Sequence, residues 1–307
     1  MSGRRVSIVV CLVTAVVLSA CGADAKTPTV APAPTPTATH ASIDVTRLPV
    51  GDGKATTQPT KGSIFVCRTT FGGGGASAKG PWFNGDGTWN ATKKVSVDGA
   101  VKWPNANVTI TLTGATRTIT GDLLPDHATG VFPIASSDDA YLYDRNPNTI
   151  KAQTLSVVLP ADPTVAATAT CVGGEVGYAR NGVPIFDGFD AGGRDAVAWE
   201  IQDDCHGHPQ MTGVYHYHDL SSCIADSGTG HSALVGYARD GFGIYGYRGE
   251  DGTEVTDADL DECHGHTHTI NWDGKDVVMY HYHATREFPY TVGCFRGASP
   301  AKAPTGG

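Results

Sequence analysis

The last third of the chain is an internal repeat, and this repeat constrains the fold more than any other feature. Three pairs of segments match, namely 176–188 with 235–247, 203–208 with 261–266, and 215–218 with 280–283. They read "VGYARNGVPIFDG" and "VGYARDGFGIYGY", then "DDCHGH" and "DECHGH", then "YHYH" in both copies. Two copies are too few for an open solenoid, which needs about three. We therefore expect a closed pair of repeats, about 172–230 and 231–297, related by a pseudo-two-fold axis.

The pattern of turns and apolar residues predicts β structure. "NVTITLTG" at 107–114 alternates with period two, and each repeat begins with two strand-like runs joined at Asn-Gly or Asp-Gly, a strong hairpin signal. The only helix signal is one acidic turn after Thr256, which would act as its N-cap. We expect a mainly β fold over 61–297, a disulfide-stabilised β-sandwich-like or barrel-like domain with an internal pseudo-two-fold duplication.

The N-terminus is typical of a secretory signal peptide. Arg4 and Arg5 precede the apolar run "VSIVVCLVTAVVLSA", which ends at Cys21. This run is shorter than the roughly 20 apolar residues that cross a bilayer. We expect cleavage after residue 20 and lipidation of Cys21, as with palmitate, giving a lipoprotein anchored at the outer face of a bacterial cytoplasmic membrane and facing the extracytoplasmic space. The alternative is an ordinary secretory signal with an incidental cysteine.

The segments on either side of the predicted domain look unstructured. Residues 21–60 comprise the anchor cysteine and a Pro/Thr/Ala-rich stretch without periodicity, which predicts an extended tether, and 298–307 predicts a disordered tail. The chain has a formal net charge of −9. This acidity argues against nucleic acid as a partner and is compatible with binding cations. The expected partner is the membrane, through the lipid, and the sequence identifies no protein partner.

Six cysteines remain once Cys11 leaves with the signal and Cys21 takes the lipid. An oxidising compartment favours disulfides, and six cysteines allow 15 pairings. The symmetry of the repeat favours one disulfide around each Tyr-His-Tyr-His. The predicted pairs are Cys205–Cys223, Cys263–Cys294 and, by remainder, Cys67–Cys171.

The histidines of the repeats are candidates for metal ligation. Side chains alternate along a strand, so His216 and His218 would share one face and their tyrosine neighbours the other. Two imidazoles about 6.6 Å apart at their Cβ atoms can converge on one metal, and His208 from the preceding loop could supply a third ligand. The candidate ligands are His208, His216, His218, His266, His281 and His283, and the expected cofactor is a divalent transition metal, copper or zinc.

Other residues are weaker candidates. His127 stands in an Asp-His pair, His206 and His264 begin the two His-Gly-His runs, and Met279 is in phase with His281. A thioether beside imidazoles would favour copper. Cys205 and Cys263 are alternative ligands if they are not in disulfides. His40 lies in the tether, and His231 and His268 have no counterpart in the other repeat, so these three are left out of the predicted site.

The chain resembles the YHYH domain proteins, a mostly bacterial, extracytoplasmic family. The resemblance rests on "PDHATG", "NPN", "GYARNGVPIFDG", "CHGHPQ", "YHYH", "DLDECHGH", "YHYHAT" and "FPYTVGC", which occur in this order from Pro125 to Cys294. It implies that the six principal histidines belong to the family motif and that His206 and His264 are less characteristic of it. It implies no particular activity.

Three functions compete. The first is a membrane-tethered metal-binding protein, motivated by the duplicated His-x-His. The second is a metal-dependent enzyme, a hydrolase or oxidoreductase of unknown substrate, in which an open coordination position activates water or supports redox chemistry. The third is a metal-free structural or adhesion module whose histidines simply pack in a half-buried strand. The sequence favours them in that order.

Overall fold

Eight strands from the two repeats form one central sheet. The computed structural model describes residues 43–226, 229–298 and 300–302. In the sheet the strand order is β11-β12-β10-β9-β13-β14-β16-β15. The first copy contributes β9 (Glu175–Ala179), β10 (Pro184–Phe186), β11 (Gly207–Pro209) and β12 (Tyr215–Tyr217), and the second contributes β13 (Leu234–Ala238), β14 (Gly243–Tyr245), β15 (Gly265–Trp272) and β16 (Lys275–His283).

This strand order is symmetric about the centre of the sheet. Outward from the centre, the first copy runs β9, β10, β12, β11 and the second runs β13, β14, β16, β15. At the centre β9 and β13 are antiparallel, and Tyr178 lies opposite its own counterpart Tyr237. The expected pseudo-two-fold duplication is therefore confirmed. The mainly β fold is confirmed as well, and the layers fit a sandwich-like arrangement. The barrel-like alternative is not seen, because β11 and β15 stay unpaired with each other at opposite ends of the described sheet.

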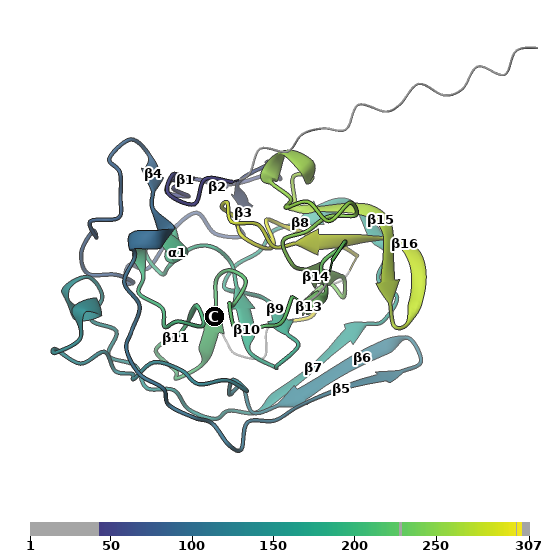
Figure 1. The fold of residues 1–307 in the computed structure, drawn as a ribbon. Coiled ribbons are helices and arrows are strands. Elements are labelled where there is room, and N and C mark those ends of the chain that lie inside the picture. Colours follow the sequence, from purple (N-terminus) through teal and green to yellow (C-terminus); the bar gives the residue numbers. More distant parts are fainter. Residues whose placement is uncertain (1–42, 227–228, 299, 303–307) are drawn as a thin grey trace, which may run out of the picture. The chain divides into compact units, whose positions relative to one another are not determined.

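A second sheet covers part of the first. It contains β5 (Val108–Thr113), β6 (Thr116–Gly121) and β7 (Leu155–Pro160), all antiparallel and side by side in Figure 1. Ile119 and Val157 from this sheet belong to the same buried cluster as Tyr178, Tyr237 and Trp272 of the large sheet. The packed sheets thus bury one face of the duplicated unit.

Short elements complete the described chain. They are β1 (Leu48–Pro49), β2 (Ala55–Thr56), β3 (Ile64–Phe65), β4 (Thr88–Trp89), β8 (Val165–Thr170), β17 (Phe295–Gly297), the one-turn helix α1 (Ala196–Trp199), and the 3₁₀ turns η1 (Ala91–Lys93), η2 (Asp139–Leu142) and η3 (Asp257–Asp259). Thr256 caps η3 through a capping box, as the sequence predicts. The α1 turn has no clear sequence signal.

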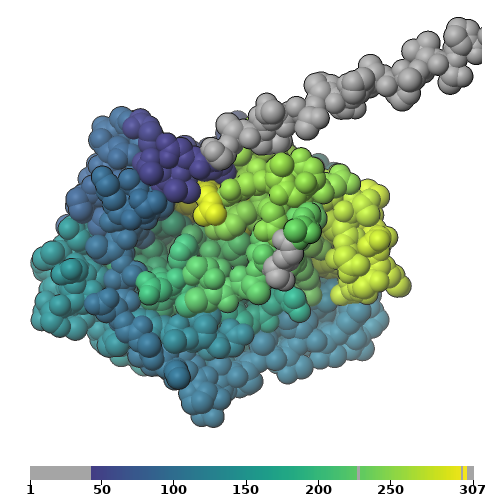
Figure 2. Space-filling model, in the orientation of Figure 1, coloured from purple at the N-terminus to yellow at the C-terminus, as the bar shows by residue number. Residues whose placement is uncertain are grey.

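The folded part begins earlier than the predicted boundary at residue 61. Leu48 is buried, β1 pairs with β4, and the Gly51 N–H donates to Asp195 Oδ2 at 2.8 Å. The first described residues (purple) lie against other parts of the chain in Figure 2. Residues 43–60 have no periodicity of their own, and they are held by residues far along the sequence. Cys21, the predicted signal peptide and tether residues up to 42 lie outside the described residues.

The three disulfides are the pairs that the repeat predicts. Cys205–Cys223 and Cys263–Cys294 each enclose one Tyr-His-Tyr-His, and Cys67–Cys171 links the segment before the sheets to the start of the first copy. Three disulfides indicate an oxidising, extracytoplasmic environment. In the described part of the chain, no helix has the length and apolar character that a membrane span requires.

Candidate metal centres

The two faces of the Tyr-His-Tyr-His strand have separate roles. The Tyr215 and Tyr217 side chains are fully buried on one face. The Tyr215 hydroxyl donates to Asp203 at 2.9 Å, and in the second copy the Tyr280 hydroxyl donates to Asp261 at 3.0 Å. The tyrosines therefore fix the strand to the preceding loop. The histidine face is buried too.

The loop that carries each His-Gly-His is wrapped around an aspartate. Asp203 Oδ1 accepts the N–H of Cys205 at 3.0 Å and that of Gly207 at 3.2 Å. The left-handed residue of this turn is His206, with φ of 63°, and not the glycine. Gly207 is required for another reason, because a Cβ there would overlap the ring of Tyr215. Gly207 therefore leaves room for the tyrosine ring, and the turn itself does not require it.

The first cluster contains His208, His216 and His218. The β11–β12 register places His208 directly opposite His216. One nitrogen from each of the three rings lies within 4.8 Å of the others, and no ring is more than 3% exposed. The Nε2 atoms of His216 and His218 are 3.1 Å apart. Three imidazoles thus converge on one buried point.

Hydrogen bonds to backbone carbonyls set the tautomers of two of the three rings in this cluster. His216 Nδ1 lies 3.2 Å from the Val214 carbonyl and His218 Nδ1 lies 2.6 Å from the Asp187 carbonyl. A carbonyl can only accept, so both Nδ1 atoms carry the proton and both Nε2 atoms present lone pairs. Two nitrogens bound to one ion at about 2.0–2.1 Å in a tetrahedral arrangement would be about 3.3 Å apart. The observed spacing is close to that of a chelating pair.

A carboxylate completes the first cluster. Glu200 follows α1, and its Oε2 lies 3.7 Å from His208 Nε2 and 3.6 Å from His218 Nε2. Its side chain is 13% exposed, and burial raises its pKa well above the ordinary glutamate value. Three nitrogens and one oxygen form a suitable donor set for a tetrahedral zinc site. Sequence reasoning missed Glu200 because nothing in its irregular neighbourhood marks it.

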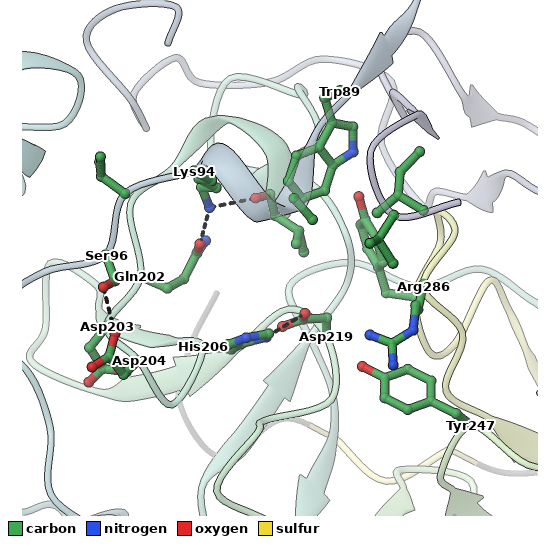
Figure 3. Close-up of a pocket in the computed structure, with 16 residues that line it drawn as sticks. Trp89, Lys94, Ser96, Gln202, Asp203, Asp204, His206, Asp219, Tyr247 and Arg286 are labelled. Carbon is green, nitrogen blue, oxygen red and sulfur yellow. Dashed lines mark hydrogen bonds and ion pairs between the residues drawn. The ribbon is translucent and has the colours of Figure 1, made fainter. Parts of the chain in front are cut away.

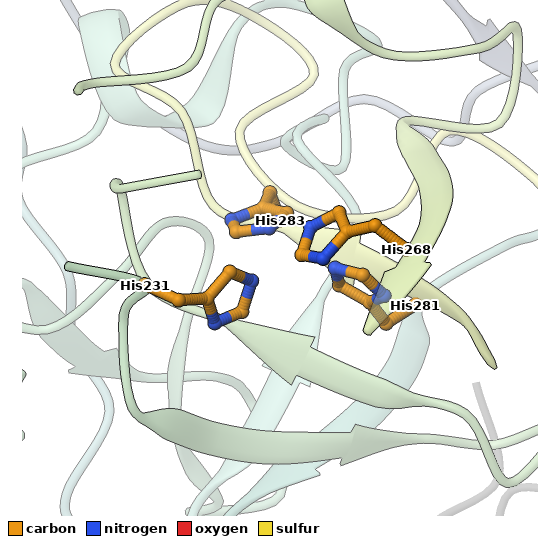
Figure 4. A group of neighbouring side chains, drawn as sticks. All are labelled: His231, His268, His281 and His283. Atoms are coloured by element: carbon orange, nitrogen blue, oxygen red, sulfur yellow. The ribbon is translucent and has the colours of Figure 1, made fainter. Parts of the chain in front are cut away.

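The second cluster holds five imidazoles. The β15–β16 register pairs His266 with His281, the counterpart of the His208–His216 pair. One nitrogen from each of His231, His268, His281 and His283 lies within 4.8 Å of the others, and Figure 4 shows these rings gathered around one point. His266 Nε2 is 3.0 Å from His268 Nε2 and forms part of the same group.

The second cluster repeats the orientation seen in the first. Nδ1 of each of the four converging rings lies 2.6–3.0 Å from a backbone carbonyl, and the acceptors are Ser232, Thr269, Met279 and Gly246 for His231, His268, His281 and His283. The Gly246 and Asp187 carbonyls occupy matching positions in the two copies. The Nε2 atoms of His231, His281 and His283 are buried without a hydrogen-bond partner. Such orphaned acceptors, held by backbone partners on the other nitrogen, fit metal ligation.

The second cluster contains two histidines that the predicted ligand set leaves out. His231 and His268 were excluded for lacking counterparts, yet the structure brings both to the cluster. His268 follows His266 by two residues on β15, so alternation along the strand predicts that both side chains lie on the same face. His231 comes from the loop before β13, and no local pattern identifies it. Unlike the first cluster, the converging donors of the second are histidines alone.

Burial keeps these imidazoles neutral. Desolvation lowers the pKa of His281 to about 2 and that of His266 to about 4. It also lowers the pKa values of His208, His216 and His283 well below the ordinary histidine value, with the neighbouring rings contributing in the same direction. Both clusters therefore present unprotonated nitrogens at neutral pH, the form that binds a metal.

The secondary candidate His127 is held on the tyrosine face. Its Nε2 lies 2.6 Å from the Tyr217 hydroxyl and its Nδ1 lies 2.9 Å from the Ala128 carbonyl. It also approaches Cys205 and Cys223, but those sulfur atoms are joined in a disulfide and offer no thiolate. Both ring nitrogens are occupied, so the structure assigns His127 a packing role.

The first histidine of each His-Gly-His points away from the clusters. His206 Nδ1 lies 2.8 Å from Asp219 Oδ2, and His264 Nε2 lies 3.0 Å from the Thr285 hydroxyl. Met279, the last secondary candidate, lies opposite His268 in the β15–β16 ladder and is half-buried. A thioether contribution to the second cluster stays a prediction.

A cavity of about 270 Å³ is lined by residues of both copies and of the segment before them. His206 and Asp219 form part of its wall, together with Lys94, Tyr247 and Arg286 (Figure 3). Lys94 Nζ donates to the Val197 carbonyl at 2.5 Å, and burial lowers its pKa to about 8. The side chains of this cavity are distinct from both histidine clusters.

Comparison with known proteins identifies one family. Residues 156–259 match the family model described as YHYH protein. The match includes the whole first cluster and ends before the second His-Gly-His. No curated protein matches the chain, and no solved structure does.

Proposed function

We propose that this chain, which belongs to the YHYH family through residues 156–259, is an extracytoplasmic metal-binding protein with one ion in each histidine cluster. The observation that carries the proposal is the convergence of bare Nε2 atoms in both copies. In each copy the two Tyr-His-Tyr-His rings have the opposite nitrogen hydrogen-bonded to a backbone carbonyl, which aims their lone pairs at the shared point.

The donor atoms favour copper or zinc. Imidazole nitrogens suit both of these ions, and neither cluster offers the set of oxygen ligands that calcium or magnesium requires. The first cluster provides three nitrogens and the Glu200 carboxylate, the four protein ligands that close a structural zinc site. The second cluster provides nitrogens alone, a donor set that Cu²⁺ also accepts. With four protein ligands, the first cluster has no open coordination position, and this favours metal binding over catalysis there.

The arrangement argues against a metal-free structural module. Two Nε2 lone pairs 3.1 Å apart in His216 and His218 repel each other unless a cation lies between them. Buried acceptors without partners also cost about 1–3 kcal/mol each. In a metal-free protein, apolar side chains at these positions would be more stabilising than histidines.

Elemental analysis of the purified, tag-free protein after loading with Zn²⁺ or Cu²⁺ tests the proposal. We expect two ions per chain in the natural sequence. The double variants His216→Ala/His218→Ala and His281→Ala/His283→Ala should each retain one ion. His206→Ala, a histidine outside both clusters, is the matched control and should retain two. No bound ion after loading, or two ions retained in both double variants, would refute the proposal.

The lipid anchor at Cys21 is a separate part of the proposal. It is supported by the apolar run that ends at this cysteine and by the disulfides, which indicate an extracytoplasmic compartment. Expression in a bacterial host with radioactive palmitate should label the chain and partition it into the membrane fraction. Cys21→Ala should abolish the label. Equal labelling of this variant would contradict the anchor.

A further inference from the structure

We propose that the second cluster is the exchange site, through which a divalent transition-metal ion enters and leaves, and that the first cluster is a sealed site. This inference rests on the proposed function and adds a division of labour to it. The two copies have matching strands and matching histidine–carbonyl hydrogen bonds, but their histidines differ in solvent exposure.

The imidazoles of the first cluster are closed to solvent. Each of the three rings is at most 3% exposed, Phe186 packs against His216 with ring centroids 4.1 Å apart, and only the Glu200 side chain, at 13% exposed, reaches towards the surface. In the second cluster, by contrast, His281 and His283 are fully buried, while His231, His266 and His268 are only partly buried. The second cluster therefore has a buried end and an end that reaches the surface.

A cavity opens at the exposed end. It has a volume of about 430 Å³, and His266 lies in its wall. Three acidic residues line the same cavity, Glu250, Asp251 and Asp259. The cavity wall otherwise consists of Gly249, Thr253 and Val255, so its charged groups are all of one sign. A hollow lined by one sign of charge concentrates ions of the opposite sign.

The buried end supplies the destination for such an ion. The Nε2 atoms of His281 and His283 have no hydrogen-bond partner, and both side chains have no exposed surface. They lie beyond His266, whose ring centroid is 4.8 Å from that of His281 and 4.9 Å from that of His283. An ion attracted by the acidic residues would thus meet His266 first and reach the unpartnered nitrogens next.

The rate of loading tests the role of the acidic cavity. The parent is His216→Ala/His218→Ala, in which only the second cluster binds, and the probe is Cu²⁺, followed by quenching of tryptophan fluorescence in stopped flow. Glu250 is exposed, so Glu250→Gln and Glu250→Lys should not disturb folding. Asp162→Lys is the control, an exposed acid outside the cavity. We expect Glu250→Lys to slow loading severalfold at low ionic strength, because it reverses a charge in the cavity wall, and the difference to shrink in high salt.

The outcomes separate this inference from the function it rests on. Slower loading in Glu250→Lys and an intermediate rate in Glu250→Gln, with Asp162→Lys unchanged, would support the acidic route. Equal rates in all variants, with one ion still bound, would overturn the route and leave the metal-binding function standing. If the parent binds no Cu²⁺ at all, the function itself fails.

Release of metal tests the sealed site. The protein loaded with two zinc ions is challenged with excess chelator, and the ion retained at each cluster is identified with the two double variants. We expect the second cluster to empty at least tenfold faster than the first. Equal release rates, or faster loss from the first cluster, would overturn the division of labour.

Discussion

At the scale of single residues, each half of the motif has a defined task. The buried tyrosines hold the strand to the aspartate of the preceding loop, and the histidines aim one nitrogen inward because a backbone carbonyl takes the other. Alternation along a strand predicts this separation of faces directly. The four histidines of the two Tyr-His-Tyr-His runs were identified from it, and His208 and His266 from the loop before each run. Glu200 and His231 were not, because both reach the clusters from irregular segments whose positions depend on the whole fold.

The Glu200 carboxyl gives the first cluster a pH dependence that can be measured. Its pKa is raised in the metal-free protein, so below that pKa a metal bound there must displace a proton. In the His281→Ala/His283→Ala background, Glu200→Gln should lower the affinity for Zn²⁺ by at least tenfold and, in acidic buffer, release fewer protons on binding. Titration calorimetry in two buffers of different ionisation enthalpy measures both. Unchanged proton release would show that Glu200 is not a ligand.

The tyrosine face makes a prediction about stability. Tyr215→Phe removes a hydroxyl that donates to the buried Asp203 and should lower the free energy of unfolding by about 1–3 kcal/mol. Tyr141→Phe is the control, since the Tyr141 hydroxyl has no hydrogen-bond partner among the described residues. Urea unfolding of the metal-free protein measures both. A loss no larger than that of the control would contradict the role of this hydrogen bond.

At the scale of elements, each copy is a strand hairpin followed by a disulfide-closed pair of strands that carries a cluster. The hairpins were predictable because Asn-Gly and Asp-Gly turns are local signals. The disulfide pairs were predictable from the symmetry of the repeat. The parallel pairing of β10 with β12 and of β14 with β16 was not, since it joins segments separated by long connections. The packing of residues 43–60 was missed for the same reason.

The close approach of β11 and the tyrosine face is tested by Gly207→Ala. The added Cβ would overlap the Tyr215 ring, so we expect a loss of about 1–3 kcal/mol in stability and weaker metal binding at the first cluster. Gly173→Ala is the matched control, because its Cβ would meet no atom within 4 Å and its φ is not positive. Unfolding midpoints in urea compare the two. Equal midpoints would show that the contact is not required.

At the scale of the whole molecule, duplication has produced two centres that share a frame and differ in donors and access. The first cluster includes the Glu200 carboxylate, whereas His231 and His268 join the second cluster. Repeat symmetry led to the duplicated fold, but it also led to the exclusion of the two histidines that have no counterpart. The departures from symmetry are where the two sites acquire different properties.

The second cluster should bind metal with little dependence on pH. Protons compete with metal only below the pKa of the free ligand, and burial lowers that pKa to about 2 for His281 and about 4 for His266. In His216→Ala/His218→Ala we expect the Zn²⁺ affinity to change less than about tenfold between pH 7.5 and 5.5. Ligands with the ordinary pKa of about 6.5 would lose about tenfold each over this interval. Competition titrations with a chelating dye at both pH values distinguish these results.

The central claim is that both histidine clusters hold a metal ion. A crystal structure of the zinc-loaded protein, with anomalous scattering measured on both sides of the zinc absorption edge, tests it most directly. We predict two anomalous peaks per chain, one within about 2.0–2.2 Å of the Nε2 atoms of His216 and His218 and of Glu200, the other bound by His281 and His283. The absence of both peaks, or peaks only at histidines outside the clusters, would contradict the account.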